Sequence, residues 1–314
     1  MNSSLGDAHL TAPTGPNGRL FTLGHGDYTA RVATVGGALA RLTWRGADLV
    51  LATDSEGDGT AYAPAYAGKV MAPWPNRLRD GRYPWAGADH RLPLTEPDTA
   101  TALHGLVCWQ EWRVASAAPD RVTLATDLWP QPGYPFRLGL AVDYALSEDG
   151  LRVTVDAVNL GDVPAPYGVA FHPYLRCGDG PLDECLADIP AARVVLTDSR
   201  GLPVREGAVD RHGLDLRGGV PLALIRADHA FTGFPDGGWQ ASLSRPGMPF
   251  RTTIASDTRW AQVFTADNIG RAGLAIEPMS CPADAFRSGA GLVTLAPGAR
   301  HTLRARLWAD PTTA

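Results

Sequence analysis

The sequence lacks any apolar run of about 18 residues, the length that a membrane-spanning helix requires. It also lacks a basic run, because 28 Lys and Arg are set against 33 Asp and Glu, and this excludes the electrostatic footprint of a nucleic-acid-binding protein. Residues 1–18 are small and polar, without the charged and apolar regions of a secretory signal. We therefore expect a cytoplasmic protein with neither a nucleic-acid nor a membrane partner.

Cysteine and lysine are both scarce. A chain of 314 residues can bury a substantial core without disulfides, so we expect free, buried thiols, although an even count would also allow two bridges. The four cysteines form no C-x-x-C pair and are Cys108, Cys177, Cys185 and Cys281. Lys69 is the only lysine, which we interpret as codon bias without functional content.

Long helices are not expected, because 35 glycines and 26 prolines interrupt the chain. Short runs with alternating apolar residues recur instead, which is typical of half-buried strands. We expect strands at 29–35, 39–44, 121–128, 139–146, 151–158, 293–295 and 301–308. Turn residues predict one hairpin at 148–150 and another at 296–300, and the polar, Gly-rich stretch 197–220 predicts a long surface loop.

This pattern predicts an all-β protein built as a large antiparallel β-sandwich. The strand series runs from about residue 20 to 309 without a Ser/Gly linker, so we expect one domain over residues 1–314. Residues 1–18 are expected to be a loosely ordered N-terminal segment.

Several loops place polar side chains among aromatic and apolar residues, where a site is expected. Glu277 stands in Gly273–Met279, an otherwise apolar strand. Its carboxylate is therefore either buried with a raised pKa and a functional role, or it reaches solvent at the end of the strand. His172 precedes Pro173, which ends or bends a strand there. Taken alone, His104 is more simply interpreted as an imidazole packed in the core. Arg77 is more simply interpreted as a solvated side chain on a rigid loop.

Other chemistries find less support. The chain has no H-E-x-x-H, no G-x-S-x-G, no P-loop and no G-x-G-x-x-G opening a helix. A zinc site of His104, His172 and Glu277 is conceivable, but no short ligand spacing supports it. We predict no metal and no cofactor.

Taken together, the polar segments resemble the aldose 1-epimerase (mutarotase) family. The family pattern is an N-R-x-x-x-G segment, a later L-H-G, an H-x-Y, a D-H-x-F and a C-terminal E-P/x-x-x-x-P-D/x-A, and this chain carries all five in that order. These are Asn76-Arg77 with Gly81, Leu103-His104-Gly105, His172-Pro173-Tyr174, Asp228-His229-Ala230-Phe231, and Glu277 with Pro282-Ala283-Asp284-Ala285. No single motif is specific, but the ordered set is.

The resemblance implies a galactose-mutarotase-like β-sandwich that interconverts the α and β anomers of a free aldose. It implies that His172 is the acid at the ring oxygen and that Glu277 is the base at the anomeric hydroxyl. It further implies substrate-binding roles for Asn76, Arg77, His104 and Asp228. A histidine of pKa about 6.5 and a glutamate of about 4.3 would suit these roles without tuning. Trp109 is the candidate for an apolar surface against the sugar.

The sequence departs from the family's common forms in ways that concern the substrate. Pro173-Tyr174-Leu175 follows the second histidine, Trp109 follows the L-H-G segment, and Met279 stands two residues after the base. The P-W-P-N-R-L-R-D-G form at 73–81 and the H-G-L-x-x-W form at 104–109 look more like a bacterial branch with some members linked to sulfosugar breakdown. The arginine-glycine motif of the branch that acts on hexose 6-phosphates is not found.

We expect a small monosaccharide as the partner and a monomer or homodimer. The alternatives are a non-catalytic carbohydrate-binding sandwich, a zinc hydrolase, and a glycoside hydrolase pairing Glu277 with Asp284 or Asp228.

Overall fold

The computed structural model describes residues 15–54 and 63–312. Most of the predicted loose segment 1–18 therefore lies outside the described residues, and Gly15 and Gly18 within it form an isolated β-bridge. Across the described ranges no helix is both long enough and apolar enough to cross a membrane.

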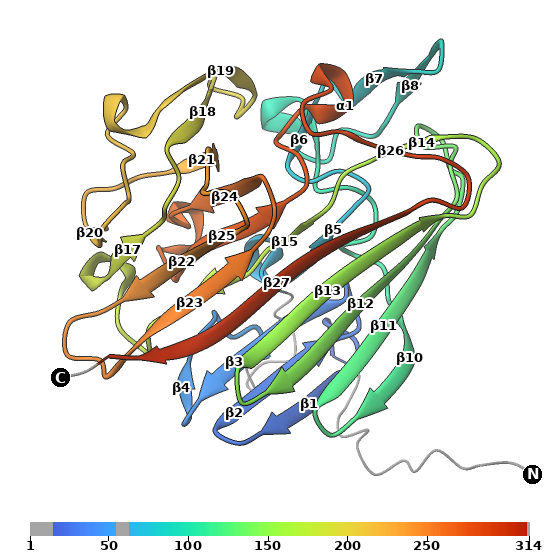
Figure 1. Ribbon diagram of the computed structural model, residues 1–314. Helices are drawn as coiled ribbons and strands as arrows, with labels where there is room; N and C mark the ends of the chain where they lie inside the picture. The colour runs from blue at the N-terminus through green and yellow to red at the C-terminus, as the bar shows by residue number, and fades with distance from the viewer. Residues whose placement is uncertain (1–14, 55–62, 313–314) are drawn as a thin grey trace, which may run out of the picture.

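The largest sheet has nine strands and forms one layer of the molecule (Figure 1). In spatial order its strands are β10 (Arg113–Ala118), β11 (Arg121–Leu128), β12 (Leu138–Ser147), β13 (Gly150–Asn159), β27 (Arg300–Pro311), β23 (Phe250–Ser256), β22 (Trp239–Ser244), β17 (Leu186–Asp188) and β20 (Val220–Pro221). Burial alternates along β12 and β13, as the sequence alternation predicts for strands with one face in the core. The predicted hairpin at 148–150 is confirmed, since Ser147 pairs with Gly150.

A second, eight-stranded antiparallel sheet carries most of the chemistry-bearing residues. Its path is β19 (Pro203–Ala208), β18 (Arg193–Thr197), β21 (Asp228–Thr232), β24 (Trp260–Phe264), β25 (Leu274–Met279), β15 (Ala170–Phe171) and β5 (Val70–Met71), with β16 (Tyr174–Leu175) also paired to β25. Its strand β25 lies close to β27 of the nine-stranded sheet. Leu274 and Ile276 of β25 join the main core, whereas Ala275 and Met279 belong to smaller clusters. The two sets alternate along the strand, so β25 contributes to both faces of the sheet.

Smaller elements complete the fold. A four-stranded N-terminal sheet contains β1 (Leu20–His25), β2 (Tyr28–Ala33), β3 (Ala38–Trp44) and β4 (Ala47–Asp48). Three two-stranded pairs are β6 (Arg77–Arg79) with β9 (Thr101–Leu103), β7 (Arg82–Trp85) with β8 (Ala88–Arg91), and β14 (Ala165–Tyr167) with β26 (Val293–Leu295). The described helices are short: α1 (Ala285–Ser288), η2 (Pro64–Tyr66), η3 (Pro97–Thr99), η4 (Leu182–Glu184), η5 (Val209–Arg211) and η6 (Asp267–Ile269).

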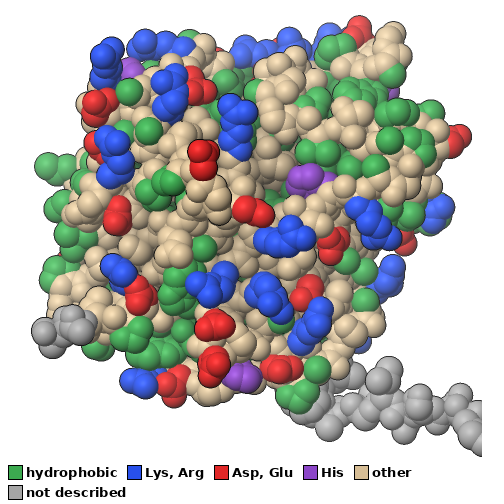
Figure 2. Space-filling model, in the orientation of Figure 1, with side chains coloured by type: hydrophobic (Ala, Val, Ile, Leu, Met, Phe, Trp, Pro, Cys, Tyr) green, Lys and Arg blue, Asp and Glu red, His purple; other side chains and the backbone are tan. Residues whose placement is uncertain are grey.

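One main apolar cluster joins the sheets, and the predicted all-β antiparallel sandwich is confirmed. The four cysteines are free and buried, as expected for a core of this size. On the face seen in Figure 2, acidic and basic side chains are intermixed, as the small net charge suggests.

Two local predictions were wrong. The strands at 293–295 and 301–308 do not form a hairpin, because β26 pairs with β14 while β27 lies between β13 and β23. The predicted loop 197–220 contains β19, which pairs with β18 over Arg193↔Ala208 to Thr197↔Pro203. The first error arises from long-range pairing, because a local turn signal does not specify which strand a neighbour will join. The second is local, because the polar, Gly-rich composition of the stretch concealed a strand that pairs with its neighbour along the chain.

Candidate active site

His172 and Glu277, distant in the chain, face one another in the eight-stranded sheet. β15 pairs Ala170 with Met279 and β16 pairs Tyr174 with Ala275, so the register brings position 172 opposite position 277. His172 Nε2 lies 3.4 Å from Glu277 Oε1, and the two side chains are 4% and 3% exposed. The strand end at Pro173, read from the sequence, thus aims the imidazole at the carboxylate.

Both groups line one cavity of about 190 Å³. This is smaller than the roughly 300–1,000 Å³ of sites for drug-sized ligands, and it suits a ligand about the size of one sugar ring. The cavity wall consists of Ala65, Tyr66, Asn76, Arg77, Glu96, Leu103, His104, His172, Tyr174, Asp228, Gln262, Phe264, Asn268 and Glu277.

The pair is left with unused hydrogen-bonding capacity. His172 Nδ1 and Glu277 Oε2 are buried, and neither has a hydrogen-bond partner. Orphaned buried polar atoms are rare in folded proteins and call for an explanation at each occurrence. Both residues line the cavity, which is what a site awaiting a polar ligand requires.

Burial moves the pKa values of the pair in opposite directions. It lowers the pKa of His172 to about 3. It raises the pKa of Glu277 well above its usual range, helped by the Asp228 carboxylate and opposed by Arg77. The raised pKa that the apolar strand predicted for Glu277 agrees with this. The ordinary pKa values that suited the roles implied by the resemblance were wrong, because both groups lie where water cannot solvate their charged forms.

His104 forms the next part of the wall, in a left-handed backbone conformation with φ of +59°. The Asn76 N–H donates to His104 Nδ1 at 3.2 Å, and the His104 N–H donates to the Asn76 carbonyl at 3.0 Å. The neutral ring therefore carries its proton on Nε2, and burial lowers its pKa well below 6.5. A Cβ at Gly105 would lie 2.1 Å from the Ala72 carbonyl oxygen, so the L-H-G motif requires its glycine. The core reading of His104 gives way to a place in the cavity wall.

Arg77 is held in place by carboxylates. Its Nε and Nη2 donate to the two oxygens of Glu96 at 2.7 and 2.9 Å, and its Nη1 donates to Asp228 Oδ2 at 3.3 Å. Two threonine hydroxyls, of Thr99 and Thr101, also donate to Glu96 Oε2. The solvated-loop reading of Arg77 was therefore wrong. Sequence reasoning missed Glu96, whose only signal was a carboxylate shortly before the strand that pairs with β6.

Asp228 is equally constrained. Gln262 Nε2 donates to Asp228 Oδ1 at 2.6 Å, and Gln262 stands opposite Glu277 in the register of β24 and β25. Both oxygens of Asp228 are thus engaged, one by an amide and the other by Arg77. Sequence reasoning also missed Gln262, because one glutamine in an apolar strand carries no motif.

Of the two remaining predicted substrate-binding residues, one lines the cavity and the other does not. Asn76 lines the cavity, and its Oδ1 accepts the Arg77 N–H at 2.8 Å. Trp109 does not line it: the indole is half exposed and packs against Tyr66, which does. Trp109 can therefore affect a ligand through Tyr66, and the expected direct contact with the sugar is not supported.

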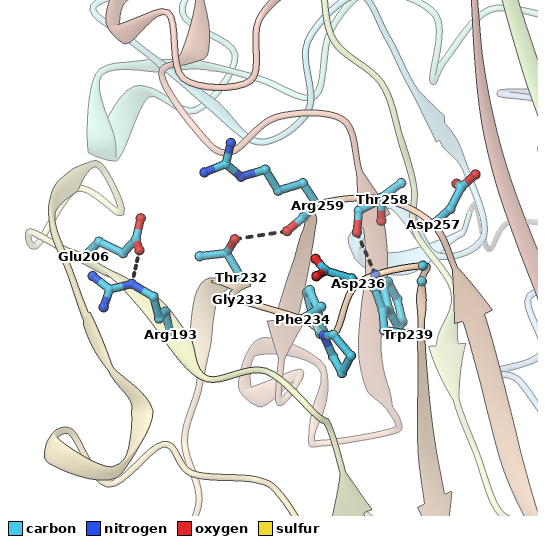
Figure 3. A pocket seen from close by; sticks show the side chains of 13 residues that line it. Arg193, Glu206, Thr232, Gly233, Phe234, Asp236, Trp239, Asp257, Thr258 and Arg259 are labelled. Atoms are coloured by element: carbon cyan, nitrogen blue, oxygen red, sulfur yellow. Dashed lines mark hydrogen bonds and ion pairs between the residues drawn. The ribbon is translucent and has the colours of Figure 1, made fainter.

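A separate hollow of about 360 Å³ lies at the loop between β21 and β22 (Figure 3). It contains none of the residues singled out in the sequence. Its charged pair, Arg193 with Glu206, is largely exposed, and its hydrogen bonds run from Thr232 and Trp239 to backbone carbonyls of the neighbouring turn. These contacts brace the loops, and among the described residues that line this hollow no buried polar group is left without a partner.

The zinc site considered from the sequence would use His104, His172 and Glu277 as ligands. Within residues 15–54 and 63–312, no group of three or more His, Cys, Asp or Glu side chains is arranged to hold a metal ion.

Comparisons with known proteins agree with the geometry. The chain is 38% identical over 288 residues to the uncharacterized protein YihR of Escherichia coli K12, covering 91% of this chain and 92% of that protein. Its fold matches a GalM/aldose epimerase homologue from C. elegans (TM-score 0.82, 19% identity, covering 94% and 99% of the two chains). It also matches galactose 1-epimerase from Lactobacillus acidophilus (TM-score 0.79, 20% identity, covering 96% and 98%). A sequence model of the family described as aldose 1-epimerase matches residues 19–308, and the chain belongs to this family.

Proposed function

We propose that this protein is a mutarotase that interconverts the α and β anomers of a free aldose by general acid–base catalysis. The observation that carries the proposal is the buried pair of His172 and Glu277, 3.4 Å apart on one cavity, each with an unpartnered polar atom. Family membership and the galactose 1-epimerase among the structural relatives support the same reaction class.

The reaction needs one proton removed and one proton delivered. Glu277 takes the proton from the anomeric hydroxyl while His172 gives a proton to the ring oxygen, and the bond from C1 to that oxygen breaks. The open aldehyde rotates about C1–C2 and recloses on its other face, with the two groups exchanging roles. No atom is gained or lost, and each positioned acid or base contributes roughly 10²–10⁴-fold to the rate.

The buried pair holds one exchangeable proton. Neutral His172 with protonated Glu277 has the same proton count as imidazolium with carboxylate, and burial favours the neutral form in the empty cavity. A sugar that donates its anomeric hydroxyl to Glu277 and accepts at its ring oxygen from His172 hydrogen-bonds the charged form. Such bonds favour the charged form, so substrate binding prepares the acid and the base together.

Arg77, Asn76, His104 and Asp228 are proposed to hold the sugar. All four line the cavity, and their orientations are set by one another and by Glu96 and Gln262. His104 presents an Nε2–H donor, and Arg77 has Nη1 on the side away from Glu96.

The glycoside hydrolase alternative is weaker in this geometry. Asp284 does not line the cavity and accepts the Arg79 N–H at 3.0 Å. Asp228 does line it, but Gln262 and Arg77 each donate to one of its oxygens. The lone pairs that remain can accept from a sugar hydroxyl, whereas these two hydrogen bonds weaken the carboxylate as a nucleophile or base. A purely binding site also fits less well, because burying an ionisable pair is costly and a neutral wall would hold a sugar without that cost.

The decisive experiment is polarimetry of freshly dissolved α-glucose, α-galactose and a sulfonated hexose, with and without the protein. We expect at least one sugar to reach anomeric equilibrium faster with the protein, and EDTA to leave the acceleration unchanged. Release of reducing sugar from a glycoside, or binding of these sugars without acceleration, would contradict the proposal.

Glu96→Gln should raise KM. The substitution keeps the shape but removes the charge that holds Arg77 by two short hydrogen bonds. Hydrogen bonds to charged groups are worth about 1.5–3 kcal/mol, so we expect kcat/KM to fall by about tenfold, mainly through KM. Glu206→Gln, in the exposed ion pair with Arg193, is the matched control and should leave both constants unchanged. A Glu96→Gln enzyme with wild-type KM would show that Glu96 does not position Arg77.

A further inference from the structure

The only lysine of the chain is fully buried. Lys69 is 0% exposed and immediately precedes β5. Its Nζ donates to the Val35 carbonyl at 3.1 Å and lies 4.4 Å from the centre of the Trp109 ring. None of the ion pairs within residues 15–54 and 63–312 includes it. Burying an ammonium without a carboxylate is costly, so this position calls for a reason beyond packing.

The neighbouring backbone is shaped around this side chain. Gly36 adopts a φ of +77°, and a Cβ there would lie 2.4 Å from the Cys108 carbonyl oxygen and 3.1 Å from Lys69 Cγ. The absence of a side chain at Gly36 therefore leaves the space in which Lys69 and Cys108 lie. A bulkier residue at position 36 would exclude the lysine.

A line of rings connects Lys69 to the cavity. Trp109 contacts Tyr66 at 5.3 Å between ring centres, and Tyr66 contacts His104 at 4.5 Å. His104 in turn contacts His172 at 5.4 Å. A side-chain hydrogen bond with Trp109 also acts on Tyr66, opposing the burial that raises its pKa.

The backbone makes a second connection. The His172 N–H donates to the Lys69 carbonyl at 3.1 Å, and the Gly68 N–H donates to the His172 carbonyl at 2.8 Å. The backbone segments that carry Lys69 and His172 are therefore held side by side.

We propose that Lys69 is a positioning residue of the sugar site: its ammonium fixes Trp109 against Tyr66, and Tyr66 sets the His104 side of the cavity. A cation over an indole face is worth about 0.5–2 kcal/mol, the larger value when it is desolvated. The inference rests on the proposed mutarotase function. It gives Lys69 and Trp109 roles in the site although neither contacts the sugar directly. It also replaces the reading of the lone lysine as codon bias.

The position makes the cation sensitive to alkali. Burial lowers the pKa of Lys69 to about 8, opposed by the neighbouring Cys108. The other titratable groups on the elements packed around it are Cys108, whose pKa burial raises to about 12, Tyr66, His172, and Glu111, which bridges to Val35 through its backbone. Among these groups Lys69 is the one whose charge changes near pH 8. Deprotonation of the ammonium removes its attraction to the Trp109 ring.

Lys69→Met tests this, because methionine keeps an unbranched stem without the charge. At pH 7 we expect KM for the accelerated sugar to rise about fivefold, with kcat changed less than twofold, since His172 and Glu277 remain. Wild-type KM should rise through pH 8 and approach that of the variant near pH 9, whereas KM of Lys69→Met should not vary over this range. Arg306→Met, which removes the cation over Trp308 at 4.1 Å, is the matched control.

A second measurement uses the wild-type protein, should Lys69→Met not fold. Labelling the lysine ε carbon with ¹³C gives one lysine signal, whose titration reports Lys69 directly. Saturating sugar should raise its midpoint, because ligand binding and protonation are reciprocal when coupled. An unchanged midpoint, or a variant KM within twofold of wild type at both pH values, would overturn the role of Lys69. A wild-type protein that accelerates no sugar would instead overturn the proposed function.

Discussion

Glu277→Gln is expected to lower kcat for mutarotation by roughly 10²–10⁴-fold, because the amide cannot take the proton from the anomeric hydroxyl. Glutamine has nearly the same shape, and the side chain is 3% exposed, so the cavity should keep its form and the sugar should still bind. The substitution also removes a buried ionisable group whose pKa burial raises, so folding should not suffer. Polarimetry gives the rate, and calorimetric titration of the sugar gives the affinity.

The control for this variant is Glu148→Gln, an exposed glutamate in the turn between β12 and β13, which should retain full activity. A Glu277→Gln enzyme that retains activity within tenfold of wild type would remove Glu277 from the role of base. A variant that no longer binds sugar would indicate that Glu277 mainly holds the substrate.

His172→Asn is expected to cost a similar factor, because asparagine cannot deliver a proton to the ring oxygen. The two groups act as a unit, so the double variant His172→Asn with Glu277→Gln should be little slower than either single variant. Additive losses would show instead that the residues act in separate steps. The measurement is the same polarimetric rate on all three proteins.

The same variant has a consequence for stability against pH. His172 has a folded pKa of about 3, below its ordinary value of 6.5, so the folded state resists its protonation. The stability linked to the neutral ring is complete above pH 6.5 and is lost as the pH falls toward 3. The free energy of unfolding, measured in urea, should therefore decline less between pH 6.5 and pH 3 for His172→Asn than for wild type. An equal decline in the two proteins would contradict the burial of this histidine.

Local patterns were sufficient for much of the fold. Alternation along 121–128, 139–146 and 151–158 identified three adjacent strands, because each has one face in the core and one toward solvent. The pairing of the last two also followed, since the turn at 148–150 joins them as antiparallel neighbours. The same logic failed at 293–308, where β26 joins β14, far away in the sequence.

The site shows the same division. Sequence motifs point to His172, Glu277, Arg77, His104 and Asp228, and all five line one cavity. Glu96 and Gln262 carry no motif, and Trp109 was expected at the sugar although it lies behind Tyr66. A residue that acts by holding another is recognised only once the two are seen together.

By itself, the sequence determined the all-β class, the strands with local partners, the ordered set of polar motifs and thereby the family resemblance, because these depend on residue type and short-range periodicity. Only the tertiary structure decided that His172 and Glu277 share a cavity, that burial drives their pKa values apart, and that Lys69 stands behind the wall. These properties depend on which distant segments meet and how much water they exclude, and neither quantity is encoded in any local stretch of the chain.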